Sequence, residues 1–108
     1  MKKTWGEFCD IFGINPRNRI LEFFLEGDEI DFSIGEVCEE TELNRATTYN
    51  IIDGLIKEKL IILTRKVSGC QLYKLDKGKK EVKILLKVFD MILDKICDEY
   101  SKKEEVYA

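Results

Sequence analysis

Residues 33–75 carry the patterns of a short helix, a tight turn, a second helix and a β-hairpin in that order, and no other feature constrains the fold as strongly. Ser33 and Glu36 have the spacing of a capping box, which predicts a helix start at this point. Thr41-Glu42-Leu43 predicts the turn, and Asn44 is a favoured N-cap for the helix that follows. The segment therefore predicts a helix-turn-helix unit.

The hairpin is predicted from two runs rich in β-branched and aromatic residues, Leu60 to Val67 and Cys70 to Leu75. Ser68-Gly69 between them has the length and composition of a two-residue hairpin turn. A helix that its predecessor holds across a three-residue turn can enter the major groove of DNA. A basic hairpin behind that helix can reach the backbone or the minor groove.

Helical patterns also precede this run. Thr4 and Glu7 form a second capping-box pattern, and the apolar residues around them predict a short first helix. Asn15-Pro16 is an N-cap followed by proline at the first helical position, which predicts a nearly all-apolar helix ending at Gly27. The alternating Ile30-Asp31-Phe32 is long enough only for a short strand.

The last helix is predicted to begin after Asp76, its N-cap, and to extend to about Lys102. Its apolar stripe is about 27 Å long at roughly 1.5 Å per residue, longer than a domain of this size covers alone. A second copy of the chain is the simplest cover, and the alternative is that the first helix folds back over the stripe. The residues expected at a dimer interface are Leu85, Phe89, Ile92, Leu93, Ile96 and Tyr100.

These patterns predict a mainly α fold with a small β-wing: a winged helix-turn-helix with N- and C-terminal dimerisation helices. A chain of 108 residues with 44% hydrophobic composition corresponds to one domain, 1–108. Its expected parts are a winged helix-turn-helix core 15–76, a helix-turn-helix 33–59, a wing 60–75 and a dimerisation helix 77–103. No apolar run approaches the roughly 20 residues of a membrane span, so we expect a cytoplasmic protein without a membrane partner.

The basic residues of the chain are concentrated in its middle third. The whole chain has a net charge of −3, but residues 44–80 carry nine basic and three acidic side chains, a net charge of +6. Residues 1–43 carry four basic and eleven acidic side chains, a net charge of −7. Local field rather than total charge decides where a polyanion binds. The basic segment includes Arg65 and Lys66, just before the hairpin tip.

The chain lacks the histidines of common enzyme sites and the closely spaced ligand pairs of structural metal sites. The chain has no histidine, and its four cysteines lie 27 to 32 residues apart. Structural zinc sites use ligands paired at short spacing, and common acid–base arrangements use histidine. We therefore expect no enzyme, no metal site and no cofactor. Cys9, Cys38 and Cys97 are expected to be small core residues, whereas Cys70 is the candidate for an exposed, redox-sensitive thiol.

The exposed face of the helix after the turn carries side chains that can read DNA. Asn44 and Thr47, near its start, can donate hydrogen bonds to phosphate. Arg45 can contact a guanine edge with two hydrogen bonds, and Asn50 can pair with adenine. Tyr49 offers its ring to a thymine methyl group, and a half-buried position against the preceding helix is an equal alternative.

LNRATTYNIIDGLIKEKLI, residues 43–61, resembles the recognition-helix pattern of winged helix-turn-helix repressors, and its RATTYN portion is similar to a run in ferric-uptake-type regulators. GCQLYKLDKGKKEV, residues 69–82, resembles the end of the wing and the entry to the last helix in the ArsR and MarR groups. The resemblance covers residues 30–82. It implies operator contacts at Asn44, Arg45, Thr47, Tyr49 and Asn50, with Arg65 and Lys66 on the wing.

Three departures narrow what the resemblance implies. Lys59 stands where such families usually have glycine. IGEVCEET holds only Cys38, so the metal-sensing C-x-C of many ArsR-type repressors is absent. The histidine ligands of ferric-uptake sensors are absent as well. The resemblance therefore implies the fold and DNA contact, without metal sensing.

The sequence thus predicts a homodimeric, sequence-specific DNA-binding transcriptional regulator, with helix 44–59 in the major groove and wing residues 64–71 on the backbone or minor groove. Two such helices would enter successive major-groove faces of an inverted repeat of double-stranded DNA. The alternative is a winged-helix protein-interaction module of a larger transcription, replication or chromatin assembly. A small-molecule effector would have to bind between the core and the dimerisation helices.

Overall fold

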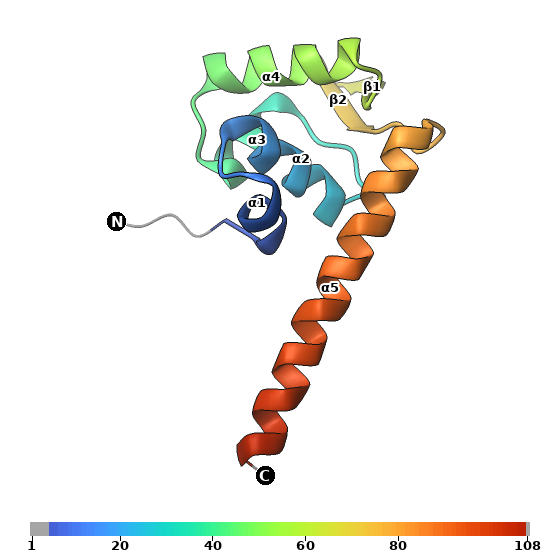
Figure 1. Cartoon of the computed structure of the whole chain (residues 1–108). Helices are drawn as coiled ribbons and strands as arrows, with labels where there is room; N and C mark the ends of the chain where they lie inside the picture. The colour runs from blue at the N-terminus through green and yellow to red at the C-terminus, as the bar shows by residue number, and fades with distance from the viewer. Residues whose placement is uncertain (1–4, 108) are drawn as a thin grey trace.

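The computed structural model describes the backbone of residues 5–107 and the side chains of residues 5–101, as helices and one β-hairpin (Figure 1). The elements in chain order are α1 (Glu7–Phe12), α2 (Pro16–Glu26), α3 (Ile34–Thr41), α4 (Arg45–Lys57), β1 (Ile61–Val67), β2 (Cys70–Leu75) and α5 (Lys80–Tyr107). This order is the one that the sequence predicts.

Three helices begin with the caps that the sequence predicts. α2 follows Asn15, α3 follows Ser33 and α4 follows Asn44, and each of these side chains accepts a backbone N–H of its helix. Ser33 and Glu36 form the complete reciprocal capping box. Capping satisfies N–H groups that have no partner within the helix, so these local signals set the helix starts.

The two terminal helices differ from the prediction. The capping box expected at Thr4 lies outside the described residues, and α1 has Gly6 as its N-cap. α5 begins at Lys80 rather than directly after Asp76, because the Asp76 carboxylate accepts the Gly78 N–H at 3.1 Å and closes a turn there. At its other end, α5 continues past Lys102 to residue 107.

The core is built around α2. Ile20, Leu21, Phe24 and Leu25 of this helix are all buried. Phe32 packs on it, with its ring centroid 5.9 Å from that of Phe24. Residues on both sides of α2 are thereby joined in one hydrophobic cluster, which stabilises the domain by removing apolar surface from water.

A single β-bridge joins the hairpin to the segment before α3. The N–H of Phe32 donates to the carbonyl of Tyr73 at 2.7 Å, and the reverse bond is 2.8 Å long. The strand predicted at residues 30–32 is therefore one bridge long. The bridge fixes the root of the hairpin against the helices.

Lys59, which stands where glycine is usual, lies in the turn that ends α4. The N–H of Leu60 donates to the carbonyl of Leu55, and the N–H of Lys59 to that of Ile56, both at 2.9 Å. This pattern is a Schellman motif, which requires a left-handed residue, and Lys59 has a φ of +65°. A side chain in this conformation costs about 1–2 kcal/mol relative to glycine.

A buried carboxylate joins α1 to α2. The Glu22 side chain is 1% exposed. It accepts the N–H of Gly6 at 3.0 Å and that of Cys9 at 3.4 Å, at the start of α1. Arg19 donates to the same carboxylate at 3.3 Å. A Cβ at Gly6 would collide with the Glu22 carboxylate as it is placed here, so a larger residue would displace that carboxylate. Glu22 therefore caps α1 from the neighbouring helix.

α5 extends well beyond the rest of the domain (Figure 1). The radius of gyration is 15.5 Å, whereas a compact domain of this length has a value of about 13 Å. Cys97, expected in the core, is exposed on this helix, because no other described element covers it. No helix within residues 5–107 is both long and apolar enough to cross a membrane.

Candidate nucleic-acid interface

α4 has one buried and one exposed face. Thr48, Ile52 and Leu55 are buried toward the core, as the sequence predicts. The turn before α4 is made possible by Glu42, which has a left-handed φ of +61°. α4 packs against α3 and lies along one edge of the domain (Figure 1).

The structure places the predicted residues of α4 on this outer face. Arg45 and Asn50 are exposed, and Tyr49 is 55% exposed, so its ring is not packed into the domain. The Asn44 carboxamide oxygen accepts the N–H of Thr47 at 2.7 Å, which leaves the amide NH₂ group of Asn44 to donate elsewhere. Thr47 itself is half-buried.

The negative charge on the outer face of α4 is partly neutralised. Asp53, one turn after Tyr49, forms an ion pair of 3.2 Å with Lys57. Both side chains are exposed, so the pair adds little stability. It does reduce the repulsion that Asp53 would exert on a phosphate group.

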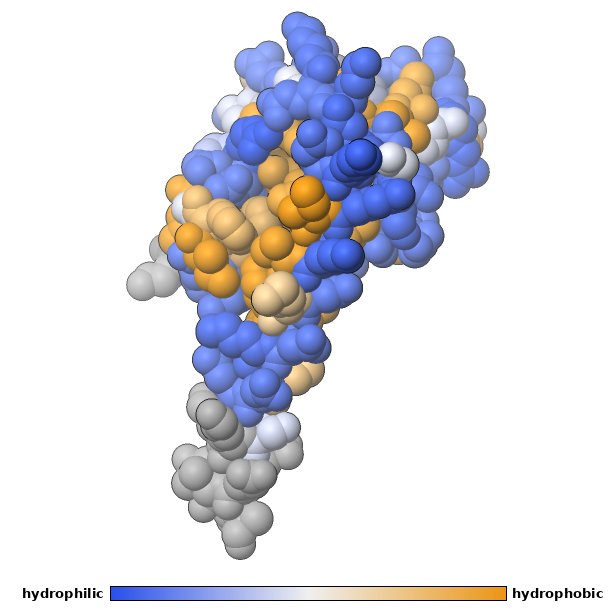
Figure 2. Space-filling view, turned by 45° about the vertical axis from the view of Figure 1, so that its right-hand side comes forward, coloured by the Kyte–Doolittle hydropathy of each residue, from blue (hydrophilic) through white to orange (hydrophobic). Residues whose placement is uncertain are grey.

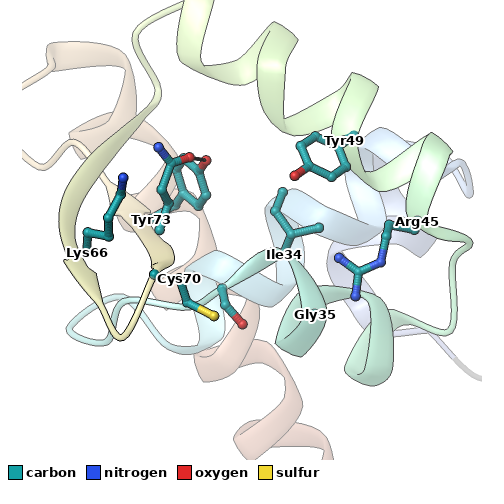
Figure 3. Close-up of a pocket in the computed structure, with 10 residues that line it drawn as sticks. Ile34, Gly35, Arg45, Tyr49, Lys66, Cys70 and Tyr73 are labelled. Atoms are coloured by element: carbon teal, nitrogen blue, oxygen red, sulfur yellow. Dashed lines mark hydrogen bonds between the residues drawn. The ribbon is translucent and has the colours of Figure 1, made fainter.

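A hollow of about 310 Å³ lies between the starts of α3 and α4 and the wing (Figure 3). Arg45 and Lys66 line it from opposite sides, and Tyr49 points into it from α4. Neither cation forms an ion pair with any residue in 5–101. The other lining residues are Ser33, Ile34, Gly35, Gly69, Cys70, Gln71 and Tyr73.

The wing is the predicted hairpin with a two-residue turn at its tip. β1 and β2 pair antiparallel, and Val67 lies opposite Cys70. Ser68 and Gly69 have φ values of +50° and +82°, and left-handed backbone at both positions is typical of a type I′ turn. This turn matches the right-handed twist of the strands and so fixes their register.

Arg65 and Lys66, predicted together as DNA contacts, lie on opposite faces of the wing. Lys66 pairs with Gln71 and lines the hollow. Arg65 pairs with Leu72, and its guanidinium makes two hydrogen bonds to Asp31, at 2.8 and 3.2 Å. The structure therefore brings Lys66, but not Arg65, to the same hollow as Arg45.

The Tyr73 hydroxyl in the wall of the hollow is kept protonated. Burial raises the pKa of Tyr73, and the nearby Tyr49 hydroxyl raises it further. The Tyr73 hydroxyl donates a hydrogen bond of 2.8 Å to Gln71. Tyr73 is thus a fixed part of the wall, while the exposed Tyr49 is the one that a ligand can reach.

The cysteines divide by burial. Cys9 is buried, and burial together with the Glu22 carboxylate raises its pKa to about 12, which keeps the thiol protonated and unreactive. Cys38 is half-buried at the edge of the core. Cys70 is exposed at the hollow, as predicted, and its redox role stays a prediction. Within residues 5–101, no group of three or more acidic, histidine or cysteine side chains could hold a metal ion.

Sequence reasoning missed part of this surface. Gln71 could have been found by counting from the two-residue turn, since the turn fixes which residue of β2 lies opposite Lys66. Ser33 and Gly35 at the start of α3, and the Asp31 partner of Arg65, carry no comparable local signal. They reach the wing only through the packing of α2 and the bridge at Phe32.

The predicted dimerisation residues of α5 fall into two groups. Phe89 and Ile92 are 8% and 5% exposed, because they pack within the domain's own core. Leu93 and Tyr100 are 45% and 65% exposed. Leu85 and Ile96 are half-buried. Folding of this chain therefore covers only part of the stripe.

Further apolar side chains lie close to the exposed part of α5. Ile11 and Phe12 of α1, with Met91 of α5, are exposed and line a hollow of about 390 Å³. Figure 2 shows an apolar area in the middle of one face, above the hydrophilic far part of α5. Exposed apolar areas of this kind mark interaction surfaces in soluble proteins.

No family model matches the sequence, and no curated protein matches it. Solved structures do match. The transcriptional regulator HlyU from Vibrio vulnificus has 23% identity and a TM-score of 0.57, over 68% of this chain and 74% of that protein. The adhesin competence repressor AdcR from Streptococcus pyogenes has 9% identity and a TM-score of 0.63, over 88% and 69%.

A variant of ZitR from Lactococcus lactis in its apo form has 12% identity and a TM-score of 0.61, over 82% of this chain and 67% of that protein. The fold is a winged helix-turn-helix. This confirms the fold that the sequence predicts and the fold part of the resemblance to ArsR and MarR proteins. The role of the terminal helices in dimerisation stays a prediction.

Proposed function

We propose that the chain is a cytoplasmic, homodimeric regulator of transcription that binds duplex DNA sequence-specifically, with α4 in the major groove and the wing beside the backbone or minor groove. The observation that carries this proposal is the pair of cations at the hollow between α4 and the wing. Arg45 and Lys66 have no ion-pair partner among the described side chains, in a chain of net charge −3. Cations without partners on an exposed surface suit phosphate groups.

The outer face of α4 supplies the proposed base contacts. Arg45 and Asn50 are exposed and carry the donors that suit guanine and adenine edges. The exposure of Tyr49 favours contact with DNA over packing on α3. Asn44 and Thr47 lie at the helix start, where the helix dipole favours phosphate. Transcriptional regulators and repressors of similar fold support the same reading.

The test is a titration of fluorescently labelled duplexes, roughly 30 base pairs long, at several salt concentrations. Two copies of Arg45 and Lys66 bring at least four cations to the DNA surface in a dimer, and each cation displaces about one condensed counterion. The affinity is therefore expected to fall at least about 100-fold between roughly 50 and 200 mM salt. Selection from random duplexes should then yield an inverted repeat with half-sites about one helical turn apart. Absence of binding at the lowest salt would favour the protein-interaction module.

Dimerisation through α5 is the second part of the proposal. Leu93 and Tyr100 lie on the same side of the helix, seven residues apart, and both are exposed. A second copy would remove them, and the nearby Ile11 and Phe12, from contact with water. It would also supply the second recognition helix that an inverted repeat requires.

We expect a mass of twice 12.6 kDa, the mass of one chain, by light scattering. Leu93→Glu should shift the mass to that of a monomer at micromolar concentration, because it would bury a charge in the interface. Asp98→Lys, which alters the charge of an exposed residue on another side of α5, is the control and should remain dimeric. A monomeric wild-type chain contradicts this part of the proposal.

A further inference from the structure

The wing contains a β-bulge that determines which side chains face the hollow. Leu63 pairs with Tyr73, but Arg65 pairs with Leu72, so Thr64 is an extra residue in β1. In a regular strand, side chains alternate between the two faces. The extra residue places Thr64 and Arg65 on the same face and shifts the residues after them by one position.

Lys66 faces the hollow as a consequence of this bulge. It pairs with Gln71, and both residues line the hollow with Tyr73. Without the extra residue, Arg65 would take the face of Tyr73, and Lys66 the opposite face. The bulge therefore exchanges the two basic residues of the wing.

Asp31 contacts both residues of the bulge. Its Oδ2 atom accepts the Thr64 hydroxyl at 2.7 Å and the Arg65 Nε–H at 2.8 Å, and its Oδ1 atom accepts a second N–H of Arg65 at 3.2 Å. Asp31 is itself held in place, because the next residue, Phe32, bridges to Tyr73 and packs on Phe23 with ring centroids 4.5 Å apart.

We propose that Asp31 is a positioning residue for DNA binding, which holds the bulged wing so that Lys66 faces the α4 side, and that Arg65 acts through Asp31 rather than on DNA. This inference rests on the proposed DNA-binding function. In the alternative interpretation, Asp31 only neutralises Arg65, and it then competes with DNA for this side chain. The two interpretations predict opposite effects of removing the carboxylate.

The contact persists across the physiological pH range. The hydrogen bonds from Arg65 and then from Thr64 hold the pKa of Asp31 at about 2. The carboxylate is therefore charged, and Arg65 remains paired with it, at the pH of a binding assay. A bidentate arginine–carboxylate pair has a defined geometry, which suits a role in orienting the wing.

The decisive experiment compares duplex binding by Asp31→Asn, Arg65→Ala and the double variant Asp31→Asn/Arg65→Ala. Each single variant is expected to weaken binding about fivefold, the order of one lost ion pair of good geometry, and the double variant no more than either. The exchanged pair, Asp31→Arg with Arg65→Asp, should recover most of the affinity. Tighter or unchanged binding by Asp31→Asn would overturn the proposal.

Glu29→Gln is the matched control, since it removes one negative charge from the same loop, at an exposed residue paired with Lys77. If only the charge of the loop mattered, Asp31→Asn and Glu29→Gln would both bind DNA as well as the wild-type chain or more tightly.

The salt dependence of binding distinguishes a residue that contacts phosphate from a residue that positions the wing. Lys66→Ala should reduce the slope of log affinity against log salt by about 0.9 per phosphate contact, whereas Arg65→Ala should leave the slope unchanged. A reduced slope for Arg65→Ala would overturn the inference.

Hydrogen exchange distinguishes failure of this inference from failure of the proposed function. The amides of residues 61–75 should exchange faster in Asp31→Asn and Arg65→Ala than in Glu29→Gln. Accelerated exchange in a protein that binds no DNA would contradict the proposed function and support the role of Asp31 in holding the wing. Unchanged exchange in all three variants would contradict the role of Asp31 in holding the wing, whether or not the wild-type chain binds DNA.

Discussion

Replacement of Arg45 by alanine is expected to weaken binding to the selected duplex at least about 30-fold. Arg45 is the first residue of α4, is exposed at the hollow, and has no ion-pair partner among the described side chains. Its loss removes the proposed guanine contact from each copy of the protein. A bidentate arginine–guanine contact is worth about 1–3 kcal/mol, so a dimer that loses two of them loses at least about 2 kcal/mol. The measurement is a fluorescence anisotropy titration at fixed salt.

Two variants control for this effect. Arg17→Ala removes the same side chain from α2, where Arg17 forms an ion pair of 2.6 Å with Glu58 at the far end of α4. It should alter affinity less than about threefold, because distant surface charges are screened by salt. Arg45→Lys keeps the charge but loses the bidentate geometry, so it should bind random duplexes nearly normally and discriminate poorly between sequences. Equal affinities for Arg45→Ala and wild type would show that α4 does not enter the groove as proposed.

Replacement of Glu22 by alanine is expected to lower the free energy of unfolding by about 2–4 kcal/mol. The carboxylate is buried and accepts two N–H groups at the start of α1 and one from Arg19. Without it, these donors lose their partner, and Arg19 becomes a largely buried charge without a counterion. Urea denaturation monitored by circular dichroism measures the change.

Glu26→Ala is the matched control for Glu22→Ala. Glu26 is the last residue of α2, one turn further along, and its side chain is exposed. Its removal should alter the unfolding free energy by less than about 0.5 kcal/mol. Glu22→Gln keeps an acceptor oxygen, so its loss of unfolding free energy should lie between those of Glu22→Ala and Glu26→Ala. A Glu22→Ala variant as stable as Glu26→Ala would mean that α1 is not fixed by this carboxylate.

Much of this fold follows from local patterns. The caps at Asn15, Ser33 and Asn44 and the turn at Ser68-Gly69 lie within three or four residues of the groups that they satisfy. Such interactions depend on little beyond the neighbouring sequence, so these helix starts and the strand pairing next to the hairpin turn were predictable. The start of α5 was not, because Asp76 can close a short turn as readily as it can cap a helix.

The proposed site was predictable only in part. The outer face of α4 follows from helical periodicity, since its buried residues determine which side faces outward. The faces of the wing residues do not follow in this way, because the bulge at Thr64 interrupts the alternation of β1 and so exchanges the faces that Arg65 and Lys66 would otherwise take. Nothing in the order of the residues marks where a strand takes up an extra residue.

The sequence by itself determined the order of the elements, the polar face of α4 and the basic character of residues 44–80, because these depend on local periodicity and composition. Only the tertiary structure decided that Asp31 meets the wing and that Glu22 caps α1. It also decided that Phe89 and Ile92 of α5 are buried within the chain while Leu93 and Tyr100 stay exposed. These contacts join residues far apart in the chain, and they exist only once the helices have packed around α2.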